Sequence, residues 1–432
     1  NNSTGNISGV IKDLYVSSSS SYSKKIEQNT YGIYNNSTGN INLNDSSIST
    51  SGYGIYNIGG NISLKSTTIS YINATASSTA DTYNYYGIYD NSGVLDLDST
   101  TMKTSSSTTN PNGYAIYMAG EVDLKFVNSE ISNYGYGIYN TNSNSSLTIE
   151  SGTINSTNSA IYNGGGTITI GSENTTPNIT GSKYAINNPK GSLTINNGNI
   201  SSSEIAINSK EYYYTTTSSI YINGGKITGN TAININGSNL EVNSGTIIGK
   251  AYGINNGYYK NTMNISESNI SAEGNKGIGV LTESPTVITN SKIIVSGVEA
   301  HALETSRNLS LSNVNIEATG VSSYGLIVNS GTLDFESSSI SAISNGSTGL
   351  SVKNGTANLI NGSIKANAYG VINSGTVVLG EKDGVVTKQQ PNIVSDNYGI
   401  YTSTKAIKFY DGIITGSKEN AFDAIVSDSE EN

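Results

Sequence analysis

The densest group of acidic side chains has the residue type that cleaves glycosidic bonds. A glycosidase needs two carboxyl groups ~5 to 9.5 Å apart, on either side of the bond to be broken. The group consists of Asp90, Asp96, Asp98, Glu121 and Asp123. If Asp96 and Asp123 occupy equivalent positions in two stacked repeats, they lie ~4.8 Å apart. This spacing is compatible with hydrolysis of a polysaccharide.

A structural role for the same acids competes with the catalytic one. Aligning the repeats places Lys65, Asp98, Lys125 and Glu150 in one row, in which the sign of the charge alternates. Opposite charges on neighbouring strands attract one another, although only weakly at an exposed surface. We therefore interpret the acidic group as a cross-strand ion ladder in preference to a catalytic site.

Few other residues are suited to acid–base chemistry or metal binding. The chain has no cysteine and one histidine, His301, which excludes thiolate chemistry and leaves a zinc ion without enough ligands. We expect His301 to be a stacked polar aromatic residue. Arg307, the single arginine, is expected in a turn near Glu304, as a turn residue or as its ion-pair partner. The sequence thus predicts no catalytic residue, metal or cofactor.

Tyrosines in two turns are the best candidates for ligand binding. Tyr212, Tyr213 and Tyr214 follow one another, and Tyr258 and Tyr259 occupy the equivalent turn two repeats later. Such turns are expected ~10 Å apart on one side of a stacked array. Tyrosine offers a large apolar face with a polar tip, which suits sugar rings or a protein partner. We interpret these five residues as a candidate ligand site, although 30 tyrosines in the chain leave a purely structural role open.

The elements that carry these residues form one repeat. Its anchor is the sequence Tyr-Gly-Ile-Tyr, followed by an alternating strand such as Ile41–Asn44, a turn, and a lone apolar residue such as Ile48. The mean period is about 24 residues, in the range of stacked solenoid units. The anchors, many of them degenerate, begin at Tyr31, Tyr53, Tyr86, Tyr114, Tyr136, Ser159, Tyr184, Ile205, Thr231, Tyr252, Lys276, His301, Tyr324, Thr348, Tyr369 and Tyr398.

One repeat cannot bury its own apolar face, so the repeats must stack with equivalent residues ~4.8 Å apart. We predict an all-β protein, a right-handed single-stranded parallel β-helix of about 16–17 coils, because the irregular period disfavours the stricter left-handed form. It forms a single domain over residues 1–432. Residues 1–30 are a partial first coil or coils, residues 31–425 regular coils, and residues 426–432 an acidic tail.

Alternation makes a prediction about each anchor. If Ile33 points inward, the second and fourth anchor positions point outward. A tyrosine ring lying across the second position would explain why that residue is almost always glycine or alanine. The long intervals, in which solenoids often carry binding loops, begin at Tyr53, Tyr86, Ile205 and Tyr369.

The anchors and segments such as Ser151–Ile154, Ser244–Ile247 and Ser330–Leu333 resemble the pectin-lyase-like superfamily of right-handed parallel β-helices. They are most similar to repetitive bacterial autotransporter and adhesin-type surface proteins. The resemblance spans residues 31–425 and concerns the fold, because this scaffold carries lyases, hydrolases, adhesins and tailspikes alike. It implies a non-catalytic extracellular protein, an adhesive stalk or filament at the cell surface. The alternative is a polysaccharide-acting enzyme or a tailspike-like depolymerase.

Composition restricts the partners. The net charge is −10, which disfavours nucleic acid, and no apolar run approaches the ~18 residues of a membrane span. Residues 1–7 repeat residues 35–41, so we expect the chain to open in the middle of a coil. The expected partners are flanking parts of a longer chain or further copies stacked end to end, together with host or bacterial glycans.

Overall fold

Parallel strands make up the protein. The structure, a computed structural model, describes residues 7–9, 14–16, 31–50, 52–71, 85–104, 113–210, 218–381, 390–403, 406–416 and 422–423. Within these ranges there is no helix, and hence no helix long and apolar enough to cross a membrane. The strands stack as a β-solenoid of about 15 turns, about 23 residues apart. This confirms the predicted all-β parallel solenoid.

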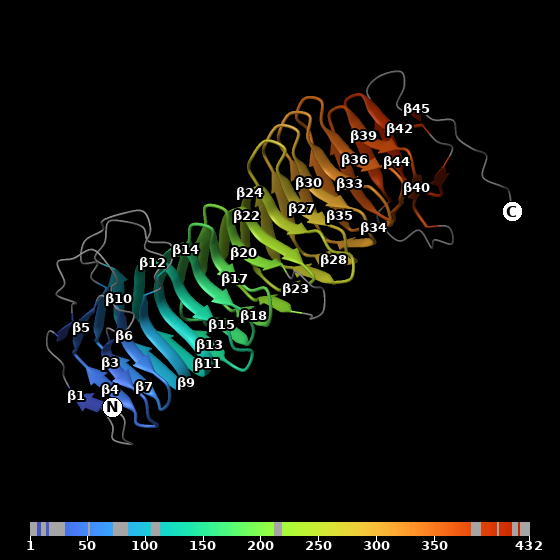
Figure 1. Ribbon diagram of the computed structural model, residues 1–432. Helices are drawn as coiled ribbons and strands as arrows, with labels where there is room; N and C mark the ends of the chain where they lie inside the picture. The colour runs from blue at the N-terminus through green and yellow to red at the C-terminus, as the bar shows by residue number, and fades with distance from the viewer. Residues whose placement is uncertain are drawn as a thin grey trace. The chain divides into compact units, whose positions relative to one another are not determined.

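The chain divides into two compact units, Asn1–Gly225 and Lys226–Asn432. In each unit the strands form stacks of parallel arrows (Figure 1). A coil contributes in turn to three faces, which we call the anchor face, the second face and the third face. The anchor face carries the Tyr-Gly-Ile-Tyr motif, and the second and third faces follow it along the chain.

In the first unit, several strands are long enough to run through a corner onto the next face. The anchor face consists of β3 (Tyr31–Asn35), β6 (Tyr53–Asn57), β9 (Tyr86–Asp98), β11 (Tyr114–Val127), β12 (Ser129–Asn140), β14 (Gly152–Asn163), β17 (Tyr184–Asn187) and β20 (Ile205–Lys210). The second face contains the ends of β9 and β11 with β1 (Ile7–Gly9), β4 (Ile41–Asn44), β7 (Ile62–Lys65), β13 (Ser146–Ile149), β15 (Thr167–Ile170), β18 (Ser192–Ile195) and β21 (Ser219–Ile222). The third face contains the starts of β12 and β14 with β2 (Leu14–Val16), β5 (Ser47–Thr50), β8 (Thr68–Tyr71), β10 (Thr101–Thr104), β16 (Asn178–Gly181) and β19 (Asn199–Ser202).

The second unit repeats this arrangement. Its anchor face consists of β22 (Lys226–Asn236), β24 (Gly245–Asn256), β27 (Ile278–Thr282), β30 (His301–Thr305), β33 (Tyr324–Val328), β36 (Thr348–Val352), β39 (Tyr369–Asn373), β42 (Tyr398–Thr402) and β45 (Phe422–Asp423). Its second face consists of β23 (Asn239–Val242), β25 (Met263–Ser266), β28 (Thr286–Thr289), β31 (Leu309–Ser312), β34 (Thr332–Glu336), β37 (Thr356–Leu359), β40 (Thr376–Leu379) and β43 (Ile407–Phe409). Its third face contains the starts of β22 and β24 with β26 (Ser268–Ala272), β29 (Lys292–Val295), β32 (Asn315–Ala318), β35 (Ser338–Ala342), β38 (Gly362–Ala366), β41 (Asn392–Ser395) and β44 (Ile413–Gly416).

The core is a set of aliphatic columns inside the coils. On the anchor face Ile33 pairs with Ile55 and Ile55 with Ile88, so that the same residue lies above its equivalent in the next coil. Ile55 and Ile88 are fully buried and Ile33 nearly so. The prediction that the third anchor position points inward is therefore confirmed. Each buried isoleucine contributes roughly 1.5–3 kcal/mol relative to its exposed state.

The prediction for the second anchor position is wrong, because this residue points inward as well. The ladder pairs Tyr31 with Tyr53 and Ile33 with Ile55 and leaves out the glycine between them. A Cβ on Gly32 would lie 2.6 Å from a backbone oxygen of the next coil and 2.8 Å from the side chain of the inward-facing Ile48. Space inside the coil, and not an overlying tyrosine ring, keeps this position small.

Left-handed residues turn the chain at the corner between the second and third faces. Asp45, Ser66, Ser99 and Asn128 have φ values of 45° to 52°, one in each successive coil. Short polar side chains tolerate this conformation better than bulky ones, because they can hydrogen-bond to the local backbone. The second unit uses the same device at the same corner, at Glu267, Asn290, Asn313 and Ser337.

Buried asparagines form a ladder beside the anchor face. In each rung the side-chain amide donates to the side-chain oxygen one coil later. Asn140 donates to Asn163 at 2.8 Å, and Asn163 donates to Asn188 at 2.7 Å. All three are fully buried. Buried amides are costly unless they are paired, so the ladder holds neighbouring coils in a single register.

Removing a rung of this ladder should destabilise the protein. Replacing Asn163 with alanine leaves Asn140 and Asn188 without their ladder partner, which we expect to lower the free energy of unfolding by about 1–3 kcal/mol in urea titrations. The control is Asn178→Ala, whose side chain accepts a 2.9 Å bond from Asn199 but is exposed. It should cost less than about 0.5 kcal/mol. Equal losses would show that burial does not give the ladder its strength.

Candidate functional site

The candidate tyrosine site lies only partly within the described residues. Tyr212, Tyr213 and Tyr214 lie outside them, so their proximity to the second turn stays a prediction. Tyr258 and Tyr259 lie in the turn after β24, with ring centroids 5.3 Å apart and planes tilted by 48°. Tyr259 is 51% exposed. This turn therefore does present an aromatic surface to solvent.

Two cations accompany the exposed ring. The Nζ of Lys260 lies 5.5 Å from the centroid of the Tyr259 ring, and the guanidinium carbon of Arg307 lies 5.7 Å from the same point. Cations at this distance are attracted by the negative face of an aromatic ring. Arg307 reaches Tyr259 from a turn two coils later. The predicted ion pair between Arg307 and Glu304 is not among the ion pairs of the described residues.

Buried polar side chains fix both of these turns. Asn256 is fully buried, and its side-chain oxygen accepts bonds from the backbone N–H of Tyr258 and the amide of Asn261. The hydroxyl of buried Thr305 accepts from the backbone N–H of Arg307 at 3.2 Å and donates to the Arg307 carbonyl at 2.9 Å. The backbone beneath the aromatic ring and the guanidinium is therefore held by side chains of the same coils.

The carboxylates with glycosidase spacing do not align as predicted. Asp96 pairs with Lys125 of the next coil, whereas Asp123 pairs with Val94. The alignment from sequence was displaced by two residues, which period-2 alternation cannot detect because both registers keep the same side chains outward. The predicted row of alternating charges holds only in part, because Lys65 faces Asp98 but Asp98 faces Val127 and not Lys125. Lys125 faces Asp96 on one side and forms a 3.2 Å ion pair with Glu150 on the other.

His301 makes a carboxylate contact that the sequence did not predict. Its Nδ1 lies 2.9 Å from a carboxylate oxygen of Glu304, whose other oxygen accepts from Asn329 at 2.7 Å. The hydrogen bond from His301 is the main reason that the pKa of Glu304 is lowered. The ring also meets Tyr324 edge to face, with planes inclined by 85°, and is not stacked on it as predicted. Within the described ranges, no three His, Cys, Asp or Glu residues gather as metal ligands.

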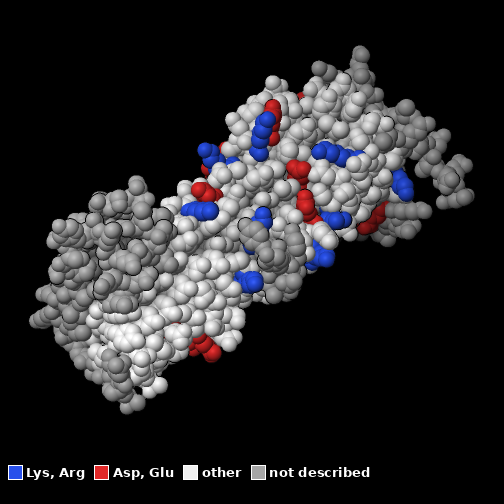
Figure 2. All heavy atoms as spheres, in the orientation of Figure 1, with Lys and Arg blue, Asp and Glu red and all other residues white. Residues whose placement is uncertain are grey.

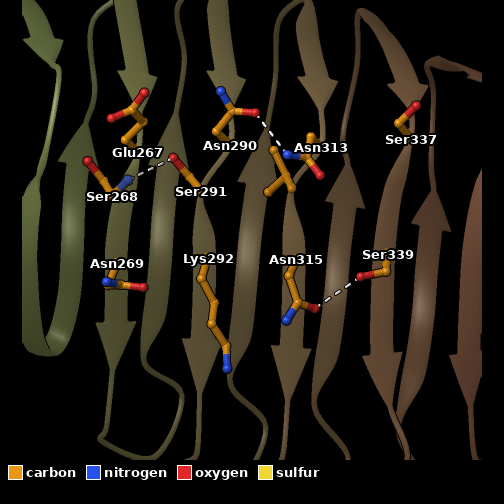
Figure 3. Close-up of a pocket in the computed structure, with 11 residues that line it drawn as sticks. Glu267, Ser268, Asn269, Asn290, Ser291, Lys292, Asn313, Asn315, Ser337 and Ser339 are labelled. Atoms are coloured by element: carbon orange, nitrogen blue, oxygen red, sulfur yellow. Dashed lines mark hydrogen bonds between the residues drawn. The ribbon is translucent and has the colours of Figure 1, made fainter.

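A polar groove on the second unit was not predicted from the sequence. It has a volume of about 400 Å³ and follows the corner between the second and third faces over four coils (Figure 3). Amide and hydroxyl groups provide most of its lining, and the signal in the sequence was the recurrence of asparagine and serine at this corner. The lining residues are Glu267, Ser268, Asn269, Asn290, Ser291, Lys292, Asn313, Val314, Asn315, Ser337 and Ser339.

The groove has little net charge available for a ligand. Lys292 forms a 2.8 Å ion pair with Glu317, which also accepts a hydrogen bond from Asn315. No aromatic ring lines the groove, so it offers no surface on which a sugar ring could stack. On the face shown in Figure 2, acidic and basic side chains of the described residues are scattered among uncharged ones.

The anchor tyrosines of the first unit stack on one another in two columns. Tyr86 and Tyr114 are 5.3 Å apart with planes inclined by 12°, and the parallel column continues from Tyr89 to Tyr117 at 5.5 Å and 8°. Between columns the rings meet edge to face, at 88° for Tyr86 and Tyr89. Offset stacking and edge-to-face packing are the favoured aromatic geometries. The faces of these rings pack on one another. The columns therefore hold neighbouring coils together and are less suited to binding a sugar ring.

One acid replaces an asparagine in the buried ladder. Asn35 donates to Asn57, and Asn57 donates at 2.8 Å to one oxygen of Asp90, which is fully buried. The other oxygen of Asp90 has no hydrogen-bond partner among the described residues, and the facing residue of the next coil is Met118. Burial raises the pKa of Asp90 to about 7, although the hydrogen bonds from Asn57 and the local backbone lower it.

The raised pKa of Asp90 makes stability depend on pH. The folded state holds the proton up to about pH 7, whereas the unfolded chain releases it near pH 3.8. The free energy of unfolding should therefore fall as the pH rises from 4 to 7. Asp90→Asn should abolish this dependence and stabilise the protein by roughly 2–4 kcal/mol at pH 8. Thermal unfolding followed from pH 4 to 8 measures both effects.

The control for this prediction is Asp96→Asn, which removes an exposed carboxylate that faces Lys125. It should leave the pH profile unchanged and lower stability by less than about 1 kcal/mol. An identical pH profile for Asp90→Asn and the unaltered protein would contradict the assignment.

The stacked columns should contribute to stability through the rings and not the hydroxyls. Tyr114 stacks on Tyr86 and Tyr136 and meets Tyr117 edge to face. Tyr114→Phe keeps these contacts and should change the free energy of unfolding by less than about 0.5 kcal/mol, whereas Tyr114→Ala should cost roughly 2–4 kcal/mol. Tyr221→Ala, at a tyrosine that is 39% exposed, is the comparison and should cost under about 1 kcal/mol. Chemical denaturation separates the three variants.

Comparisons with known proteins give no match. No family model, no curated protein and no solved structure matches the chain. The fold that the structure shows is therefore the parallel β-solenoid itself, and its resemblance to the pectin-lyase-like superfamily rests on the repeat motifs alone.

Proposed function

We propose that this chain is a non-catalytic extracellular structural protein, an adhesive stalk or filament at the cell surface, built as a pectin-lyase-like β-helix of the bacterial autotransporter or adhesin type. The observation that carries the proposal is the use of side chains to join coils. Tyrosine columns, the asparagine ladder and the aliphatic columns all connect neighbouring coils. Contacts of this kind strengthen a long repeat array, which is what a spacer or a filament requires.

The acidic residues support this reading over the alternative of a polysaccharide-cleaving enzyme. The two carboxylates that a hydrolase would need, Asp96 and Asp123, face Lys125 and Val94 respectively. The Asp123 side chain also accepts a 2.5 Å hydrogen bond from Ser146. A depolymerase remains the competing proposal, and the measurement of activity decides between them.

Incubation of the purified chain with a panel of bacterial and host polysaccharides tests for cleavage, read as new reducing ends. We expect none. Cleavage that disappears in an Asp96→Asn/Asp123→Asn double variant would replace the structural proposal with the enzymatic one. Cleavage that persists in this variant would also refute the structural role, and would place the active residues elsewhere.

Negative-stain electron microscopy over a concentration series separates the two structural roles. Long uniform fibres would identify end-to-end stacking of copies, as expected for a filament. Discrete single particles at every concentration would identify a stalk segment whose ends join other parts of a longer chain. Mass photometry of the same samples gives the number of copies in each species.

A further inference from the structure

Tyr258, Tyr259, Lys260 and Arg307 form a surface that we call the basic aromatic cluster. Lys260 and Arg307 are both exposed, and their charged groups each lie within 6 Å of the Tyr259 ring centroid. The chain has a net charge of −10, so two cations beside one ring are opposite in sign to the charge of the chain as a whole. The cluster thus differs electrostatically from most of the molecule.

Among the residues that the structure describes, neither cation forms an ion pair. The ion pairs of the described residues join Lys125 to Glu150, Lys276 to Glu299, Lys292 to Glu317 and His301 to Glu304, and none involves the cluster. Over the same part of the chain, no oxygen is recorded as accepting from the guanidinium of Arg307. A guanidinium held by an aromatic ring keeps its N–H donors for a planar anion, which they can bind in a bidentate manner.

We infer that the basic aromatic cluster binds an acidic saccharide. The sugar ring packs against the exposed surface of Tyr259, and its carboxylate or sulfate group pairs with Arg307 and Lys260. A neutral sugar would use only the ring, and a small anion only the cations, whereas an acidic sugar uses both. This inference rests on the proposed adhesive function and names the class of ligand that the adhesion would recognise.

The architecture suits such a site. Asn256 and Thr305 fix the backbones of the two turns from inside the coils, so little order has to be gained on binding. The glycine of the following coil, Gly331, lies against the backbone of Arg307 with φ of 81°, and a Cβ there would lie 2.5 Å from the Arg307 carbonyl carbon. The surface is therefore supported by packing as well as by hydrogen bonds.

An acidic residue lies in the coil between the two turns, and its effect on binding should be opposite to that of the two cations. Glu283 is exposed, and its backbone N–H bonds the carbonyl of Asn256, directly before the tyrosine turn. In the following coil, the backbone N–H of Ser306, which precedes Arg307, bonds the carbonyl of Thr282. A carboxylate at this place repels an anionic ligand, so its removal should strengthen binding.

Binding is tested with three probes of similar length: a hyaluronan oligosaccharide that carries carboxylates, a chondroitin sulfate oligosaccharide that adds sulfates, and a neutral chitin oligosaccharide. Calorimetry or NMR titration of the full chain should show binding of the acidic probes and at least about ten-fold weaker binding of the neutral one. The relative affinity of the first two probes tells whether carboxylate or sulfate is preferred.

Variants connect the binding to the cluster. Arg307→Gln and Tyr259→Ala should each weaken binding of the acidic probe by about ten-fold or more, and Glu283→Gln should tighten it about two- to five-fold. The matched control is Lys365→Gln, which removes an exposed cation elsewhere in the second unit and should leave the affinity unchanged. Circular dichroism checks that each variant keeps the strand content of the parent.

Several results would overturn the inference. Equal binding of neutral and acidic probes would remove the role of the cations, and an equal loss with Lys365→Gln would show a general charge effect. Absence of binding at millimolar probe would also refute it, while leaving the structural role intact. Cleavage of a probe would instead refute the proposed non-catalytic function, so that the two failures are distinguishable.

Discussion

The constraint on which the rest of the structure depends is the in-register stacking of each coil on its equivalent one repeat later. Parallel pairing fixes the distance between coils at about 4.8 Å, a spacing that lets the side-chain amides of equivalent residues hydrogen-bond and equivalent aromatic rings stack. Any side chain repeated at the period of the coil therefore meets a copy of itself. Isoleucine gives an apolar column, asparagine a chain of hydrogen bonds, and tyrosine a stack of rings.

This constraint explains how much could be predicted from the sequence. The inward direction of Ile33 and its equivalents followed from alternation, because an error in repeat length does not change which face a strand residue takes. The second anchor position was predicted wrongly because strict alternation fails there: the ladder leaves out Gly32, and Gly32 and Ile33 both point inward. The size of this position is set by packing against Ile48, and alternation along one strand does not predict a contact between two strands of a coil.

In the candidate site, too, some features could be predicted from the sequence and others could not. That Tyr259 is exposed could be expected from its place in a turn, whereas its contact with Arg307 joins residues 48 positions apart and depends on how two turns project from their coils. The displacement between Asp96 and Asp123 arose from the unequal lengths of neighbouring repeats, in which an alignment of motifs can slip by two residues unnoticed. The ladders are thus predictable from residue type, and the surfaces between them depend on loop lengths.

The asparagine ladder also has a direction, which bears on how such a chain can change its length. From Asn35 to Asn57 and from Asn140 to Asn188, each side-chain amide donates a hydrogen bond to the next coil. If a coil is duplicated or lost within such a run, every donor still has an acceptor. The side chain of Asp90 accepts a hydrogen bond from Asn57 but has no N–H to donate to the next coil. The facing residue there, Met118, needs no hydrogen bond. This pair closes one run before the next begins. Duplication of a coil inside a run keeps the hydrogen bonds of the ladder, whereas duplication at the Asp90–Met118 pair interrupts them. This pair therefore marks a border between two segments whose numbers of coils can change independently.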